Sequence, residues 1–299
     1  MILYCLVGVA AFLLYISVVS YAIATVVNRK GHDPSASSIS SALLLGHVGI
    51  SWLSMLVMGY AQIRHWTKVL WPLRGAQPLN QAPAKAVVFV HGAYHNASAW
   101  HFIKPVVLRR LGGARDYCFC YRVGKKNLED LALELDLFLR QCVKDSGTSE
   151  LLLIGHSLGG LIARYYRSTM ASRQVEENNT PKLEGVITLS TPHAGTLFAK
   201  CGLDPLSRSL YPGSPVFRSL EARERELATQ PAPPTNGHAL HPFLDNMVIP
   251  ARCLRVNSPG WRSKELPGLS HLALLWHPAA LRAVCDALAD MSRTMPPCP

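Results

Sequence analysis

The sequence predicts an α/β fold, with a mostly parallel sheet flanked by helices and a transmembrane helical hairpin in front of it. Three observations lead to this prediction. Short apolar runs alternate with amphipathic stretches from residue 86 onward, which is typical of parallel strands connected by helices. One apolar run passes through a Gly-x-Ser-x-Gly turn directly into a helical pattern. Before residue 64, two long segments carry no charged side chain.

The two uncharged segments are Met1–Val27 and Ile39–Ile63, and each exceeds the about 20 residues that a helix needs to cross a bilayer. We therefore expect transmembrane helices over residues 1–28 and 39–63, followed by a proline-containing linker over residues 64–85. A signal peptide would be shorter and would begin with basic residues. Aromatic residues suited to anchor the helices at the membrane interfaces are Tyr21, Trp52, Tyr60, Trp66 and Trp71.

A buried core helix is the alternative for the second segment, because polar residues interrupt it. These residues are Ser40, Ser41, His47, Ser51 and Ser54. With two crossings, both flanks of the hairpin lie on the same side of the membrane. Three basic residues follow the second helix and two lie in the loop, so the positive-inside rule favours a cytoplasmic location for the rest of the chain. We expect an integral protein of a bacterial inner membrane.

The eight cysteines support the same location. Seven of them lie beyond the first helix at irregular spacing, which does not indicate a disulfide framework. No spacing of cysteine and histidine suggests a metal site.

The remainder of the chain is predicted to alternate strands and helices. The predicted strands cover residues 85–90, 117–123, 151–154 and 185–189, with a weak strand over 237–243. The predicted helices cover residues 100–111, 127–142, 161–166 and 278–291. Residues 196–236 break the alternation with six prolines and a short helix near 216–229. We interpret this segment as a cap or lid, with a disordered surface loop as the alternative.

The segment Gly155-His156-Ser157-Leu158-Gly159 follows a buried strand and matches a nucleophile elbow. The turn is so tight that a side chain two positions before or after the serine would collide with the helix or the strand, and glycine avoids this collision. Such a turn raises the hydroxyl group of Ser157 above the end of the sheet, beside a helix N-terminus that favours negative charge. Ser157 is therefore the predicted nucleophile.

An elbow serine requires an acid and a histidine, which follow it in that order along the chain. His271 lies in a loop before an apolar segment and is the predicted base; the alternatives are His277, His241 and His238. Asp245 lies 26 residues earlier at the start of a short apolar run, and it would fix the tautomer of the imidazole. The alternative acids are Asp204, Glu221 and Glu265.

An oxyanion hole requires two backbone N–H groups directed at one oxygen atom. One is expected from Leu158, which follows the nucleophile. The other is expected from Ala93, because the strand over residues 85–90 ends in His91 and Gly92, and the glycine allows the backbone to turn inward.

These motifs resemble, in their order along residues 86–285, the α/β-hydrolase superfamily, and more narrowly the bacterial lipases and esterases similar to the Bacillus-type minimal lipase. The matching segments are Val88–Gly92, Gly155–Gly160, Leu189–Thr196, Asp245–Val248 and Gly268–Leu275. The resemblance implies that residues 86–299 form a catalytic domain, and that the domain hydrolyses esters through an acyl-serine without a cofactor. The insertion after Gly195 is absent from the smallest members.

The resemblance and the predicted membrane hairpin imply a lipid or another acyl ester as the substrate. The net charge of +11 favours contact with anionic lipid headgroups. Nucleic acid is not an expected partner, because the basic residues are scattered and no recognition motif is present. Three alternatives stay open: an acyltransferase or thioesterase with the same triad, a phospholipase acting on the host bilayer, and an inactive membrane scaffold. The sequence leaves the oligomeric state open.

Overall fold

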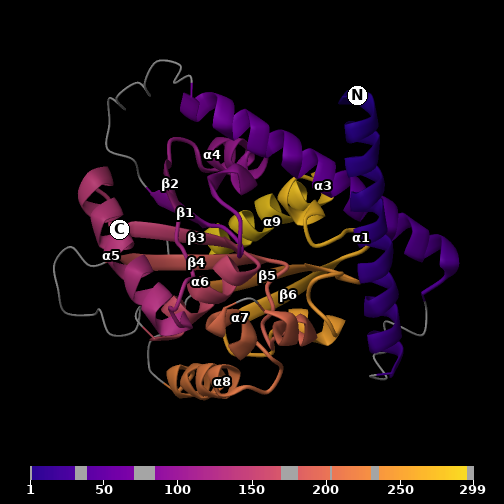
Figure 1. The fold of residues 1–299 in the computed structure, drawn as a ribbon. Helices are drawn as coiled ribbons and strands as arrows, with labels where there is room; N and C mark the ends of the chain where they lie inside the picture. The colour runs from indigo at the N-terminus through magenta and orange to yellow at the C-terminus, as the bar shows by residue number, and fades with distance from the viewer. Residues whose placement is uncertain are drawn as a thin grey trace.

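The computed structural model describes residues 2–30, 39–70, 85–169, 181–202, 204–229 and 236–294. At its centre lies a six-stranded parallel sheet with the strand order β2-β1-β3-β4-β5-β6 (Figure 1). The strands are β1 (Ala86–Val90), β2 (Arg115–Phe119), β3 (Glu150–His156), β4 (Lys182–Leu189), β5 (Asn236–Pro242) and β6 (Trp261–Leu266). The predicted α/β architecture is therefore confirmed.

Helices cover both faces of the sheet, and the strand residues alternate between them. Figure 1 shows α5 (Leu128–Ser146) and α6 (Leu158–Thr169) on one side, with α4 (Ile103–Leu111) and α9 (Pro278–Thr294) on the other. Val88 and Leu153 belong to the core against α5 and α6, whereas Phe89 and Ile154 belong to the core against α4 and α9. Because both faces are buried, the central strands carry near-continuous apolar runs rather than an alternating pattern.

Several element boundaries differ from the prediction, each because of tertiary contacts. Strand β2 ends at Phe119 instead of reaching residue 123, and Tyr121 beyond it stacks on the ring of His91. Strand β5, which looked weak in the sequence, is buried because it pairs with β4 and β6 on its two sides. Strand β6 was not predicted, since this edge strand is mostly exposed and polar.

The cap segment is folded over much of its length, which excludes a disordered loop for the described part. It contains a 3₁₀ helix at Leu197–Cys201, the short helix α7 (Pro205–Ser209) and helix α8 (Pro215–Leu227). Phe217 and Leu220 of α8 are buried in the same apolar cluster as α5 and α6. Residues 230–235 of the predicted cap lie outside the described residues.

Two long apolar helices precede the sheet, as predicted. Helix α1 spans Ile2–Lys30 and α3 spans Ser41–Leu70. Over Val7–Lys30 and Ser41–Thr67 they are long and apolar enough to cross a membrane. Only 22% of the residues in each apolar window are buried, whereas the core helix of a soluble domain would be mostly buried. Helix α3 continues beyond the predicted boundary at residue 63, and residues 71–84 of the predicted linker lie outside the described residues.

The arrangement of the two helices differs from that of a separate anchor. They cross each other, and α3 lies along the sheet domain (Figure 1). Tyr21 was predicted to anchor α1 at a membrane interface, but it is fully buried against residues of the domain. Trp52 donates a hydrogen bond to the carbonyl oxygen of Ala10, 2.9 Å away, and thereby joins α3 to α1. Tyr60 and Trp66 are exposed, and Trp71 lies outside the described residues.

Candidate active site

Ser157 occupies the sharp turn between β3 and α6 with a left-handed backbone (φ = +53°), which is strained for a residue other than glycine. Its N–H donates to the carbonyl oxygen of Leu189 on β4 at 2.9 Å. Its own carbonyl oxygen accepts the N–H groups of Gly160 and Leu161, which begin helix α6. The backbone of Ser157 therefore links the carboxyl end of β3 to β4 and starts helix α6, while the serine residue stays partly exposed.

The glycines around Ser157 are required for steric reasons. A Cβ atom on Gly155 would lie 2.5 Å from the Cα of Gly160, and one on Gly159 would lie 2.1 Å from the carbonyl oxygen of Val90. Both distances are shorter than real Cβ contacts; the collision of Gly155 with the helix is as expected, whereas Gly159 would collide with the neighbouring strand β1 rather than with the strand before the elbow. Gly160 has the same constraint, since its Cβ would lie 1.9 Å from Oγ1 of Thr191.

Asp245 and His271 are brought together from loops that follow β5 and β6. Nδ1 of His271 donates to the Asp245 carboxylate, at 2.9 Å from Oδ2 and 3.1 Å from Oδ1. Oδ1 also accepts the N–H groups of Met247 (2.6 Å) and Val248 (2.9 Å). The fully buried carboxylate therefore accepts in each of these hydrogen bonds. This contact holds the imidazole in the tautomer whose Nε2 can accept a proton.

The loop after β1 passes directly over the serine. A Cβ atom on Gly92 would lie 3.1 Å from the Cβ of Ser157, so the residue directly before Ala93 packs against the predicted nucleophile. Nδ1 of His91 donates to the carbonyl oxygen of Gly92 at 2.8 Å. Tyr121 stacks on the His91 ring at 4.6 Å, and its hydroxyl group donates to the His91 carbonyl oxygen at 2.8 Å. Tyr121 thus holds the predicted oxyanion loop, and no local sequence signal indicates this role.

His156 connects the elbow to the loop of the predicted base. It is buried, and its Nε2 donates to the carbonyl oxygen of His271 at 3.2 Å, with the two rings 4.8 Å apart. Burial, assisted by the nearby His271, lowers the pKa of His156 well below its usual value, so this imidazole is neutral. The side chain next to Ser157 therefore fixes the position of the backbone of His271.

A model of the Alpha/beta hydrolase family matches residues 87–287, about two thirds of the chain. The chain belongs to the α/β-hydrolase family. No curated protein matches it. Solved structures of similar fold are a lipase from Bacillus licheniformis, phospholipase PlaB from Legionella pneumophila and a carboxylesterase from Nitrososphaera gargenis.

The lipase is 16% identical with a TM-score of 0.53, over 72% of this chain and 96% of that one. The phospholipase is 16% identical with a TM-score of 0.53, over 71% of this chain and 62% of that one. The carboxylesterase is 14% identical with a TM-score of 0.51, over 73% of this chain and 94% of that one. At these identities, the likeness concerns the fold.

The alternative histidines of this α/β-hydrolase have other contacts. His277 accepts the N–H of Ala279 at the start of α9, at 3.2 Å. Nδ1 of His241 donates to the carbonyl oxygen of Pro242 at 3.1 Å. His238 lies 3.6 Å from the Asp290 carboxylate. Within the described part of the chain, His271 is the histidine that donates a hydrogen bond to Asp245.

The alternative acids also have other positions. Asp204 caps α7 by accepting the N–H of Ser207 at 2.8 Å, and it accepts the hydroxyl group of Tyr94 at 2.7 Å. Glu265 forms an exposed ion pair with Arg255, and Glu221 is exposed on α8. Asp204 thereby ties the segment predicted as a cap to Tyr94, the residue after Ala93. In the described ranges, no group of three or more His, Cys, Asp or Glu side chains is arranged to hold a metal ion.

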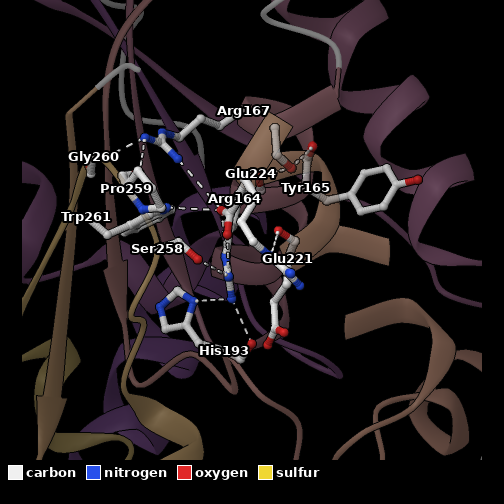
Figure 2. Close-up of polar contacts among 12 residues, drawn as sticks. Arg164, Tyr165, Arg167, His193, Glu221, Glu224, Ser258, Pro259, Gly260 and Trp261 are labelled. Carbon is white, nitrogen blue, oxygen red and sulfur yellow. Dashed lines mark hydrogen bonds and ion pairs between the residues drawn. The ribbon is translucent and has the colours of Figure 1, made fainter. Parts of the chain in front are cut away.

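A buried ionic cluster holds α8 against α6, the helix that follows Ser157 (Figure 2). Arg164 on α6 pairs with Glu224 on α8 through two hydrogen bonds, Nε to Oε1 at 3.0 Å and Nη2 to Oε2 at 2.6 Å. Oε1 also accepts Nε1–H of Trp261 at 3.1 Å and lies 3.7 Å from Nη1 of Arg167. Arg164 further donates to the carbonyl oxygen of His193 at 2.7 Å, in the loop after β4. Local sequence patterns gave no sign of this cluster.

Proposed function

We propose that this α/β-hydrolase cleaves carboxylic esters of lipids at a membrane, through an acyl-serine intermediate. The observation that carries the proposal is the buried hydrogen bond between Asp245 and His271, on a loop that His156 ties to the elbow of Ser157. An acceptor carboxylate, an oriented imidazole and an elbow serine form the arrangement that activates a hydroxyl group for acyl transfer.

In the proposed reaction, Oγ of Ser157 attacks the ester carbonyl while Nε2 of His271 takes its proton. His271 returns that proton to the leaving alcohol, and Asp245 stabilises the imidazolium. The N–H groups of Ala93 and Leu158 hold the oxyanion, and loss of one such donor typically lowers the rate by about 100- to 1000-fold. A water molecule, activated by His271, then releases the acid from the serine.

A lipid substrate is supported by the surface of α1 and α3. Their outward faces carry many exposed large apolar side chains, far more than a soluble surface normally shows. These are Tyr4, Val7, Val9, Phe12, Leu14, Tyr15, Ile16, Val18, Val19, Ile23, Val26, Leu45, Leu53, Leu56, Tyr60, Ile63 and Trp66. The lipase and phospholipase of similar fold support the same substrate class. The cytoplasmic side and the bacterial inner membrane stay predictions from the sequence.

The decisive experiment is labelling of the detergent-solubilised full chain with a fluorophosphonate probe, beside Ser157→Ala. The exposed Ser219 on α8 supplies the matched control, Ser219→Ala. We expect labelling of the wild type and of Ser219→Ala, and loss of labelling with retained folding in Ser157→Ala. If the folded wild type does not label, the proposal is wrong and the inactive scaffold takes its place. Product analysis with competing alcohols then distinguishes hydrolysis from acyl transfer to another acceptor.

A further inference from the structure

The two apolar helices turn their polar side chains toward the hydrolase domain. The buried polar residues of α1 are Ser17, Ser20, Thr25 and Asn28, and those of α3 are His47, Ser51 and Ser54. Their spacing of three to five residues keeps them on one side of each helix, opposite the exposed apolar side chains. This pattern is the reverse of a soluble amphipathic helix, in which the apolar side is buried.

The inward side of the helices contacts the loop of the predicted acid. Asn246, the residue after Asp245, is buried, and its Nδ2 donates to Oγ of Ser20 (3.2 Å) and Oγ of Ser51 (3.4 Å). Further along the same loop, the N–H of Ala251 donates to Oδ1 of Asn28 at 2.8 Å. Leu244, on the other side of Asp245, is buried in an apolar cluster with residues of both helices.

The same side of α3 contacts the loop of the predicted base. Nδ1 of His47 donates to the carbonyl oxygen of Leu269 at 3.1 Å. The Ser54 hydroxyl group donates to its own helix at Ile50, so it accepts from Ser270, whose Oγ lies 3.3 Å away. Ser270 directly precedes His271. Both members of the predicted acid–base pair therefore have a neighbour in the chain that is hydrogen-bonded to the helices.

Helix α3 also reaches the predicted oxyanion loop. Oε1 of Gln62 accepts Nδ2–H of Asn96 at 3.0 Å and the hydroxyl group of Ser98 at 2.7 Å. Asn96 in turn accepts the N–H of Ser98 and caps the 3₁₀ helix that follows Ala93. Three loops that are far apart in the sequence thus meet on one pair of helices.

We propose that α1 and α3 are a positioning element of the active site, which orients Asp245 through Asn246 and His271 through Ser270. This inference rests on the proposed function. Polar groups in an apolar helix are costly unless they are hydrogen-bonded, and here their partners are the loops of the site. A misplacement of about 1 Å in such a site can lower the rate about 100-fold. Seating of the helices against the domain and assembly of the catalytic geometry are therefore coupled.

The test uses the full chain in detergent, with p-nitrophenyl butyrate as the probe substrate and fluorophosphonate titration to count reactive sites. The double variant Ser20→Ala/Ser51→Ala removes both acceptors of the Asn246 amide. We expect kcat per titrated site to fall about 10- to 100-fold, with KM changed little, because the acid and base act on the reacting atoms rather than on binding. Ser41→Ala, at an exposed serine of α3, is the matched control and should match the wild type.

Rescue by a conservative change separates positioning from simple destabilisation. Ser20→Ala/Ser51→Thr keeps one hydroxyl acceptor and should recover most of the lost kcat. If the double alanine variant folds poorly, Ser54→Ala alone removes the acceptor of Ser270 and should lower kcat in the same manner. Unchanged kcat per titrated site in these variants overturns the inference, even if fewer sites titrate. A folded wild type that neither labels nor hydrolyses overturns the proposed function, and this inference with it.

Discussion

Removal of the Glu224 side chain is expected to destabilise the cap and the elbow helix together. Glu224 is the carboxylate of the buried cluster in Figure 2, and the side chains of Arg164 and Glu224 are 2% and 1% exposed. In Glu224→Ala, both Arg164 and Arg167 would keep a buried charge without this partner, and Trp261 would lose its acceptor. Burial already lowers the pKa of Arg167 to about 10, which indicates how unfavourable its surroundings are for a charge.

The magnitude follows from this loss of charge compensation. Breaking a buried ion pair by removing one partner costs about 3–5 kcal/mol. For a domain of this size, 1 kcal/mol shifts the unfolding midpoint by about 2–4 °C, so Glu224→Ala should lower it by about 6–20 °C. Glu221→Ala removes an exposed carboxylate one turn earlier on α8 and should change the stability by less than about 0.5 kcal/mol. Thermal unfolding of the two variants in the same detergent gives the comparison.

The pH dependence gives a second measurement of the same interaction. Burial acts to raise the pKa of Glu224, but the hydrogen bonds and charge of Arg164 outweigh it, and the pKa lies below its usual value. A carboxylate with a lowered pKa stabilises the fold above its unfolded pKa of about 4.3, and this contribution is lost as the pH falls through the folded pKa. The difference in unfolding midpoint between the wild type and Glu224→Gln should therefore be constant near neutral pH and shrink below about pH 4.

For the thermal comparison at neutral pH, an unfolding midpoint of Glu224→Ala equal to that of Glu221→Ala would refute the reasoning.

Two further predictions concern the site itself. Asp245→Asn should lower kcat for p-nitrophenyl butyrate by about 10⁴-fold, because an amide at this position no longer selects the tautomer of His271. The circular dichroism spectrum should stay unchanged. A loss of kcat below tenfold would remove Asp245 from the predicted triad. Gly159→Ala would place a Cβ atom 2.1 Å from the backbone oxygen of Val90, so we expect no folded, fluorophosphonate-reactive protein. Gly46→Ala, where no atom lies within 4 Å, should behave as the wild type, and normal labelling of Gly159→Ala would contradict the packing argument.

The elements that the sequence predicted well depend on local constraints. Helix α5 begins after Asn127, whose side chain forms a capping box with Asp130, and such caps act within one helical turn. The elbow could be recognised from five consecutive residues, Gly155–Gly159, although only Gly155 avoids a clash with a residue close in the chain, whereas Gly159 avoids one with Val90 on β1. Strand β6 was missed because an exposed edge strand has no apolar pattern, and its pairing with β5 depends on residues distant in the sequence.

The N-terminal helices illustrate the same limit within a single segment. Hydropathy predicted two helices of membrane-spanning length, and the structure has them. The serines and the histidine of the second helix looked like interruptions of an apolar run. In the structure, His47, Ser51 and Ser54 contact the loops next to Asp245 and His271, and Tyr21 faces the domain rather than a membrane interface.

The sequence by itself determined the family, because several short motifs occur in the right order along the chain, and it predicted Ser157 from a turn that spans only a few residues. Only the tertiary structure decided which side of each apolar helix is buried, that Glu224 binds Arg164, and that Tyr121 and His156 support the loops of the site. These contacts join residues far apart in the chain. The free energy of such a pair depends on where the fold places its two members, and neither local sequence carries that information.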